Sequence, residues 1–456
     1  MSRLFGTDGV RGVANRDLTP DLAFEIGMAA ARVLTEETHH KPTFVVGADT
    51  RVSCGMLASA LIAGINAAGA DVVYAGVIAT PGVAWLTLEL QADAGAMISA
   101  SHNSFEYNGI KLFSSSGFKL PDEIEDKIET HVKEGYPPEM RPVGDKVGRL
   151  IRLDEGADMY TEHLLSIADV DLTGLRLVID CANGASYHTA PKLFQALGAE
   201  VIAFGVEPDG FNINLDCGST HADRLAHHVI EEKADMGLAF DGDADRLIAI
   251  DDQGELCDGD VMLAILAMDL DRRNELSKKT IVATVMSNIG LQLMTERFGM
   301  TLVRTAVGDR YVLEHMLQEG FCLGGEQSGH VILLKDATTG DGQLTALRFL
   351  RAIRRLGEGQ PLSELRRVVQ LFPQVLENVL VKESLRNKIL EHETLLSAVL
   401  EVEEALASEG RVLLRKSGTE PLIRVMIEGP DLSLIRSHAR HLASIVETLS
   451  KQSDKD

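Results

Sequence analysis

Residues 43–101 decide the fold, and they read TFVVGADTRVSCGMLASALIAGINAAGADVVYAGVIATPGVAWLTLELQADAGAMISAS. Three short apolar runs, at 43–49, 72–78 and 94–98, alternate with helix-like segments around 56–68 and 83–92. Strands that alternate with helices of this length predict βαβ units and parallel or mixed sheets. This part of the chain is therefore expected to form an α/β domain.

The same alternation returns twice further along the chain. LRLVIDCANG, EVIAFGV and ADMGLAF form a second series from residue 175, and IVATVMSN, TLVRTAVGD and YVLEHMLQEG belong to a third from residue 281. Beyond residue 369 the pattern changes, and the strand-like runs RVLLR and LIRVMIE lie between helix-like segments. We expect three related α/β domains with mixed sheets, at residues 1–150, 151–255 and 256–368, and a smaller α+β domain at 369–456.

The charge of the chain excludes some classes of partner. Its 456 residues contain 44 Lys and Arg against 68 Asp and Glu, a formal net charge of −24. Nucleic acids and anionic membranes are poor partners, because binding to both depends on Lys and Arg. There is no signal-peptide run, no segment approaches the roughly 18 apolar residues of a membrane span, and the five scattered cysteines form no CxxC pair. We expect a cytoplasmic protein without nucleic-acid or membrane partners, to which a small anion can still bind.

The segment LAFDGDADRLIAIDD (238–252) carries the strongest local chemistry. Asp241, Asp243 and Asp245 are two residues apart, so in an extended loop their side chains share one side. Three converging carboxylates repel one another unless a cation neutralises them, and hard divalent cations prefer oxygen ligands. Apolar runs on both sides place the loop between buried strands, which favours a metal site over a solvated acidic turn.

Two other interpretations of this segment can be tested on the sequence. An EF-hand requires Gly and Glu at loop positions where this chain has Arg246 and Asp252, so it is excluded. A phosphatase with Asp241 as its nucleophile is expected to have a helix after the loop, whereas residues 247–251 have the pattern of a strand. The phosphatase stays open as the second hypothesis.

The segment AGAMISASHNSFEYNGIKLF (94–113) places Ser101 and His102 directly after a buried strand. Neighbours on an extended chain point apart, so no Ser–His pair is expected, and the chain has no GxSxG motif of a serine hydrolase. A functional Ser101 is therefore expected to carry a phosphoryl group, whose oxygens would add a ligand for the metal. An ordinary polar loop is the alternative.

Two further loops contain side chains suited to a phosphosugar. In FCLGGEQSGHVILL (321–334), Glu326 and Ser328 can bind sugar hydroxyls, and His330 titrates near neutrality. Near the N-terminus, GTDGVRG places Arg11 between glycines, which suits an anion, and VGDRYV (307–312) is a weaker candidate for positioning a loop. The hairpin-like RVLLRKSGTEPLIRVMIE (411–428) is not a P-loop, but it gathers residues that suit a phosphate group: Arg415, Lys416, Ser417, Gly418, Thr419 and Arg424.

Taken in order, the serine loop, DGDADR, GEQSGH and RKSGTEPLIR resemble the motifs of the α-D-phosphohexomutase superfamily, over essentially the whole chain. FGTDGVRG, VGDRYV and RKSGTEPLIRVM are most similar to the bacterial branch that acts on glucosamine phosphates. The resemblance implies four domains around a central cleft, an active phosphoserine and Mg²⁺.

The resemblance also implies a reaction and a set of roles. An isomerase would interconvert glucosamine 6-phosphate and glucosamine 1-phosphate through a bisphosphate, and so feed UDP-N-acetylglucosamine synthesis. Phosphorylated Ser101 and the three aspartates would hold Mg²⁺, Arg11 and Arg246 would add positive charge, and Lys111 and His330 would transfer protons. Glu326 and Ser328 would hold sugar hydroxyls. A clamp on the non-reacting phosphate would consist of Arg415, Ser417, Gly418, Thr419 and Arg424.

Two positions depart from the superfamily pattern. Ser104 replaces the proline that usually ends SASHNP, and Ala244 stands where glycine is common. Neither is a ligand residue, so we expect an effect on loop stiffness rather than on activity. Phosphomannomutases and phosphoglucomutases use similar loops and remain alternatives, as do a metal-dependent sugar-phosphate phosphatase and a non-catalytic phosphosugar-binding protein. The chain is expected to be a monomer or a homodimer.

Overall fold

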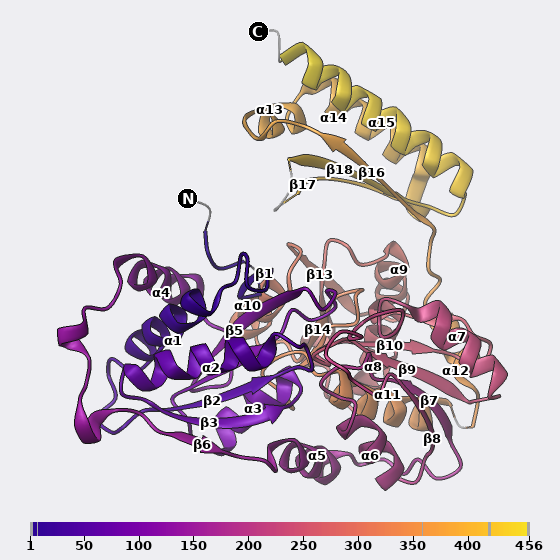
Figure 1. Cartoon of the computed structure of the whole chain (residues 1–456). Coiled ribbons are helices and arrows are strands. Elements are labelled where there is room, and N and C mark those ends of the chain that lie inside the picture. The colour runs from indigo at the N-terminus through magenta and orange to yellow at the C-terminus, as the bar shows by residue number, and fades with distance from the viewer. Residues whose placement is uncertain (1–2, 7, 358, 418–420, 454–456) are drawn as a thin grey trace. The chain divides into compact units, whose positions relative to one another are not determined.

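The computed structural model describes residues 3–6, 8–357, 359–417 and 421–453, which fall into two compact units. The first unit contains Met1–Thr284 and Val303–Val368, and the second contains Val285–Leu302 and Val369–Asp456. Figure 1 labels their helices and strands. Within the described ranges, no helix combines the length and the apolar character that crossing a membrane requires.

The first sheet is mixed, as the N-terminal pattern predicts. Its strands lie in the order β1-β5-β4-β2-β3-β6. β2 is parallel to β3 and β4, whereas β5 is antiparallel to β1 and β4. The strands are β1 (Val10–Val13), β2 (Thr43–Ala48), β3 (Asp71–Val77), β4 (Ala94–Ile98), β5 (Tyr107–Ser114) and β6 (Leu150–Arg152). The helices of this part are α1 (Pro20–Leu34), α2 (Cys54–Ala67), α3 (Thr80–Glu89) and α4 (Asp122–Glu134).

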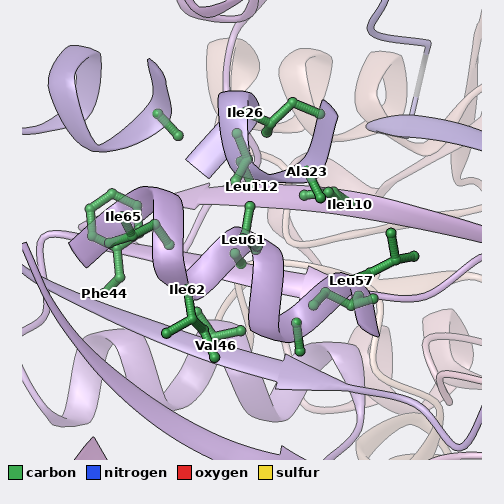
Figure 2. Packing of buried hydrophobic residues seen from close by; sticks show 14 of the residues in the cluster. Ala23, Ile26, Phe44, Val46, Leu57, Leu61, Ile62, Ile65, Ile110 and Leu112 are labelled. Carbon is green, nitrogen blue, oxygen red and sulfur yellow. The ribbon is translucent and has the colours of Figure 1, made fainter. Parts of the chain in front are cut away.

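A core of apolar side chains joins this sheet to α1 and α2 (Figure 2). Ile26 of α1, Leu61 of α2 and Val46 of β2 are fully buried in it. The two helices pack closely because glycines face each contact: a Cβ on Gly27 would lie 2.3 Å from a carbonyl oxygen of α2, and one on Gly64 would lie 2.0 Å from a carbonyl oxygen of α1. The serine loop follows β4, an inner strand of this sheet.

The second sheet contains the hairpin that carries the aspartate loop. Its order is β11-β10-β9-β7-β8, in which β7 is parallel to β8 and β9, and β10 is antiparallel to β9. The strands are β7 (Arg176–Asp180), β8 (Glu200–Phe204), β9 (Met236–Phe240), β10 (Leu247–Ile250) and β11 (Leu256–Cys257). The helices are α5 (Gly156–Ile167), α6 (Thr189–Ala196) and α7 (Ala222–Glu231).

The third sheet has the order β13-β12-β14-β15, with β12 parallel to β14 and β14 antiparallel to β15. Its strands are β12 (Thr280–Thr284), β13 (Thr301–Thr305), β14 (Leu323–Gly325) and β15 (Val331–Leu333). The helices that follow the second sheet in sequence are α8 (Gly259–Arg272), α9 (Ile289–Arg297), α10 (Asp309–Glu319), α11 (Gly342–Gly357) and α12 (Leu362–Leu365).

The C-terminal part has a small antiparallel sheet in the order β16-β18-β17. Its strands are β16 (Gln374–Leu380), β17 (Arg411–Lys416) and β18 (Leu422–Glu428), and its helices are α13 (Arg386–Leu390), α14 (Glu393–Leu406) and α15 (Leu432–Ser453). Leu395 of α14, Ile427 of β18 and Leu442 of α15 are buried in one core. Three parts with mixed sheets and a smaller α+β part confirm the expected fold class.

Candidate functional site

The aspartate loop connects β9 to β10, whose residues Phe240 and Leu247 pair at its base. The segment after the loop is the expected strand, not the helix that the phosphatase hypothesis requires. Asp241, Asp243 and Asp245 are buried, and each offers a carboxylate oxygen within 4.8 Å of the others. The three side chains therefore converge.

The carboxylate oxygens of this loop suit a bound cation. Oδ1 of Asp243 and Oδ1 of Asp245 are buried and have no hydrogen-bond partner in the described part of the chain. Burial and the charges of Asp245 and Asp243 raise the pKa of Asp241 well above its usual range. A buried oxygen without a partner is costly, and a hard divalent cation would supply that partner. The residues present therefore fit a bound metal ion.

Lys111 brings positive charge to the same loop. It lies on β5, opposite Met97 of β4, and is almost fully buried. Its Nζ lies 2.8 Å from Oδ2 of Asp243 and 3.1 Å from Oδ2 of Asp245, and a third carboxylate, that of Asp8, is 3.0 Å away. Burial acts against the charge, but Asp243, Asp245 and Asp8 raise the pKa of Lys111 well above its usual value. Lys111 is therefore a charged ammonium group in this arrangement.

Ser101 lies directly after β4 and faces the aspartate loop. Its hydroxyl donates a hydrogen bond of 2.5 Å to Oδ2 of Asp241. Its φ of 53° is in the left-handed region, which residues other than glycine rarely adopt. The turn brings Nδ1 of His102 to 3.3 Å from Oγ of Ser101. The expectation that these side chains point apart is wrong, because it assumes an extended chain.

Arg11 and Arg246 bring positive charge close to this pair. Burial, then Arg246 and Arg11, lower the pKa of His102 to about 4. The backbone N–H of Arg246 donates to Oδ1 of Asp241 at 3.1 Å. The Nε atoms of both arginines are buried and have no hydrogen-bond partner among the described residues. These N–H groups suit the oxygens of a phosphoryl group on Ser101.

The loop expected to bind the sugar turns between β14 and β15. The backbone N–H of Leu247 donates to the carbonyl of Gly329 at 3.0 Å, which fixes this loop to the end of the aspartate loop. Oε1 of the half-buried Glu326 accepts a hydrogen bond from the backbone N–H of Gly308 at 3.1 Å. The hydroxyl of the exposed Ser328 lies 3.4 Å from Oε2 of Glu326. Glu326 and Ser328 thus form one polar group beside the aspartate loop.

His330 connects this loop to a largely buried network of charges. Its Nδ1 lies 3.6 Å from Oδ1 of Asp245, and its Nε2 lies 3.4 Å from Oδ2 of Asp309. Burial acts to lower the pKa of His330, but Asp309 and Asp245 raise it above its usual value. Lys119 forms ion pairs with both Asp309 and Asp8. The network therefore reaches from the aspartate loop to the N-terminal GTDGVRG segment.

Sequence reasoning overlooks several residues that contact these loops. Asp8 has a local signal, because it lies in the same glycine-rich segment as Arg11 and pairs with it. The others belong to no recognised motif: Lys119 and Asn214 have partners distant in sequence, and Arg51 pairs with Asp49 and donates to backbone carbonyls. The overlooked residues are Asp8, Asp49, Arg51, Lys119 and Asn214.

The expected phosphate clamp belongs to the second unit and is described within it. Arg415 of β17 lies opposite Arg424 of β18, and burial together with the charge of Arg424 lowers the pKa of Arg415. Nη2 of Arg424 lies 3.5 Å from Oγ of Ser417. Gly418 and Thr419 lie outside the described residues. Two neighbouring guanidinium groups that repel each other favour an anion between them.

Four models of the phosphoglucomutase/phosphomannomutase family match successive parts of the chain. Those of the alpha/beta/alpha domains I, II and III match residues 2–138, 158–254 and 258–372. The model of the C-terminal domain matches residues 376–444. Together they cover most of the sequence.

Curated proteins named phosphoglucosamine mutase are similar over nearly the full length. One from Acetivibrio thermocellus is 51% identical over 447 residues, which are 98% of this chain and 99% of the relative. One from Thermoanaerobacter sp. strain X514 is 53% identical with the same coverage.

Solved structures share the fold. A phosphoglucomutase/phosphomannomutase family protein from Burkholderia thailandensis has a TM-score of 0.83 at 24% identity, covering 98% of both chains. The N-acetylphosphoglucosamine mutase of Aspergillus fumigatus, in complex with GlcNAc-6P and magnesium, has a TM-score of 0.70 at 17% identity, covering 98% of this chain and 96% of its own. At these identities the likeness concerns the fold alone.

Proposed function

The chain belongs to the phosphoglucomutase/phosphomannomutase family of phosphohexomutases, which are isomerases, and from this premise we propose that it interconverts glucosamine 6-phosphate and glucosamine 1-phosphate. The choice of glucosamine is supported by relatives named phosphoglucosamine mutase at 51% and 53% identity over 98% of the chain. The main observation in support of the proposal is the 2.5 Å hydrogen bond from Oγ of Ser101 to Asp241, because a phosphoryl group on this oxygen would lie beside the aspartate loop. The product would feed UDP-N-acetylglucosamine synthesis, and we expect the reaction to take place in the cytoplasm.

In the proposed reaction Ser101 carries the phosphoryl group. The bond between Oγ and phosphorus breaks as the free hydroxyl oxygen of the sugar phosphate bonds to phosphorus. The hydroxyl proton passes to a nearby base, and Oγ of Ser101 takes up a proton in return. The product of this step is glucosamine 1,6-bisphosphate. The reverse transfer, from the other phosphate to Ser101, completes the isomerisation and restores the phosphoserine.

Charged side chains around Ser101 would stabilise the transferred group. Arg11 and Arg246 have buried Nε–H groups suited to phosphoryl oxygens. Lys111 and His330 stay our candidates for proton transfer at the sugar hydroxyl, and both lie against Asp245. The high pKa of Lys111 also supports a role as a fixed positive charge.

The sugar phosphate would be held by two groups of side chains. Glu326 and Ser328 would accept and donate hydrogen bonds to sugar hydroxyls, in either orientation of the ring. The clamp would bind the phosphate that does not react, through the residues Arg415, Ser417, Gly418, Thr419 and Arg424. We keep a monomer or a homodimer as the expected assembly.

The three aspartates and phosphorylated Ser101 would hold Mg²⁺. Two buried carboxylate oxygens that accept no hydrogen bond from the described residues support a metal at this loop, and oxygen ligands favour Mg²⁺. The A. fumigatus mutase was solved in complex with magnesium, which supports the same choice. When bound, the ion would supply positive charge beside the phosphoryl oxygens.

A coupled assay with Mg²⁺ tests the proposal on glucosamine, glucose and mannose phosphates, with release of inorganic phosphate followed in parallel. We expect the highest kcat/KM for glucosamine phosphate and little phosphate release. Comparable rates on the three sugars would contradict the glucosamine assignment. Phosphate as the main product would favour the phosphatase with Asp241 as its nucleophile.

A further inference from the structure

The serine loop rests on a buried arginine. Arg51 follows β2, and its side chain has no exposed surface. Its Nη2 donates to the carbonyl oxygens of Ser101 and Asn103, each at 2.8 Å, and its Nη1 donates to that of Ser104. Its Nε donates to Oδ2 of Asp49 at 2.9 Å, so a carboxylate balances the buried charge. One guanidinium group therefore binds three carbonyls of a single loop.

Both backbone polar groups of Ser101 are held in place. Its N–H donates to Oγ of Ser99 at 2.9 Å, and the Ser99 hydroxyl in turn donates to Asp49 at 2.7 Å. Its carbonyl accepts from Arg51 and also from Nδ2 of Asn214, at 2.8 Å each. The surroundings therefore impose the left-handed φ of 53° at Ser101.

The second donor couples the serine loop to a different sheet. Asn214 lies in the segment between β8 and α7, and its Nδ2 also donates to the carbonyl of Asn103 at 2.9 Å. It thus binds two of the carbonyls that Arg51 binds. A Cβ on Gly242 would lie 2.5 Å from the carbonyl oxygen of Ser101, so the aspartate loop packs against the same peptide group. These contacts leave rotation of the Ser101 side chain as its main freedom.

We infer that Arg51 and Asn214 are positioning residues, which hold Ser101 in the conformation that phosphoryl transfer requires. The inference rests on the proposed function. Without these donors the peptide groups around Ser101 would relax toward a common backbone conformation, and Oγ would leave Asp241. A displacement of about 1 Å at a reacting group can lower turnover by about 10²-fold.

Arginine is needed at this position rather than any cation. The three carbonyls and Asp49 are reached by three different nitrogens of the guanidinium group. A lysine ammonium presents its donors from one point and cannot reproduce this set. Arg51→Lys therefore keeps the positive charge but cannot make this set of hydrogen bonds.

Arg348 of α11 is a matched control in the same unit. Its side chain is 6% exposed, against none for that of Arg51. It pairs with Asp336 at 2.9 Å and donates to the carbonyl of Ile167 at 2.6 Å. Arg348→Lys thus removes a comparable set of buried contacts whose partners lie outside the serine and aspartate loops.

The test compares the wild type with Arg51→Lys, Asn214→Ala and Arg348→Lys. Three measurements are made: the coupled assay gives kcat and KM, intact mass gives the rate at which glucosamine 1,6-bisphosphate phosphorylates Ser101, and backbone hydrogen exchange is followed at residues 99–104. We expect Arg51→Lys to lower kcat by about 10²-fold with KM unchanged, to slow phosphorylation and to speed exchange. Asn214→Ala should act in the same direction but less strongly, and Arg348→Lys should change none of the three.

Each alternative result is decisive. If kcat falls no further in Arg51→Lys than in Arg348→Lys, or if KM rises as kcat falls, the inference is overturned although the wild type is a mutase. If the wild type does not act on glucosamine phosphates, the proposed function fails, and equal hydrogen exchange in the two lysine variants would then overturn the inference separately. If Arg51→Lys does not fold, the same measurements on Asn214→Ala are compared with those on Arg348→Lys.

Discussion

The hydroxyl of Ser101 donates a 2.5 Å hydrogen bond to Asp241, which lies 140 residues away in sequence. The contact joins the loop after β4 to the hairpin β9–β10. A phosphoryl group on Ser101 would replace the donating proton with negative oxygens, which repel a carboxylate unless a cation lies between them. Phosphorylation of Ser101 and binding of a metal ion are therefore expected to favour each other.

Removing the Ser101 hydroxyl should abolish most mutase turnover, because no other group would carry the phosphoryl group. Ser101→Ala should still bind sugar phosphate, which calorimetry can measure, and intact mass should show no labile phosphate. Ser59→Ala, at an exposed position of α2, is the control and should behave as the wild type. Normal turnover by Ser101→Ala would contradict the proposal that Ser101 carries the phosphoryl group.

A metal ion should stabilise the folded protein through the aspartate loop. Addition of Mg²⁺ should raise the Tm of the wild type, because a ligand that binds only the folded state stabilises it. Asp243→Asn should remove that rise and lower turnover by about 10²-fold or more, since the charge of a metal is worth several kcal/mol in the transition state. Asp223→Asn, exposed on α7, should keep both. A Tm that responds to Mg²⁺ equally in all three proteins would place the ion elsewhere.

The loops that carry the chemistry are predictable because each follows a short apolar run. The runs at 94–98 and 238–240 become parts of β4 and β9, and Ser101 and the aspartates follow them directly. The position of Lys111 is not predictable in this way. It reaches the aspartates because β5 pairs with β4 and places it opposite Met97, and such pairing depends on the whole sheet rather than on local sequence.

The conformation of the serine loop is the second limit of sequence reasoning. A serine does not favour a positive φ, so nothing local predicts the turn at Ser101 or the approach of His102. The carbonyl of Ser101 accepts hydrogen bonds from the side chains of Arg51 and Asn214. Carbonyls occur at every residue, so this kind of partner leaves no pattern in the sequence.

Asp341 should make the stability of the first unit depend on pH. Burial raises its pKa from 3.8 to about 6, so the folded state binds more protons than the unfolded state between these values. Stability should therefore fall as pH rises from about 4 to about 6 and stay lower above that, by about 3 kcal/mol. Asp341→Asn can still accept from the N–H of Leu344 and should lose this dependence. The Tm of Asp341→Asn minus the Tm of the wild type should therefore increase from pH 5 to pH 8. A difference that stays constant would contradict a raised pKa at Asp341.

Ala244 has a strained backbone conformation. Its φ of 56° is left-handed, which costs an L-residue about 1–2 kcal/mol. Ala244→Gly should relieve this strain, but the glycine also raises the conformational entropy of the unfolded chain. The net effect should be a stabilisation of up to about 1 kcal/mol, with turnover unchanged. Ala239→Gly, within β9, should instead destabilise it by about 0.5–1 kcal/mol or more. Urea unfolding distinguishes the two, and equal losses would show that Ala244 is not strained.

The paired arginines of the second unit should govern affinity for the substrate more than the rate of the chemical step. Arg415 and Arg424 face each other across β17 and β18, and burial and mutual repulsion lower the pKa of Arg415. An anion would relieve that repulsion. Arg424→Ala should raise KM for the sugar phosphate by about 10–100-fold, because a charge-assisted hydrogen bond contributes about 1.5–3 kcal/mol, with a smaller change in kcat.

The matched control for the clamp is Arg440→Ala. The side chain of Arg440, on α15, is 72% exposed, so this substitution should leave KM unchanged. High salt should reduce the difference between Arg424→Ala and the wild type, because screening weakens the attraction that the substitution removes. Steady-state kinetics at two ionic strengths measures both effects. A fall in kcat with KM unchanged would instead assign Arg424 to the chemical step, since a group that only binds the non-reacting phosphate contributes equally before and during transfer.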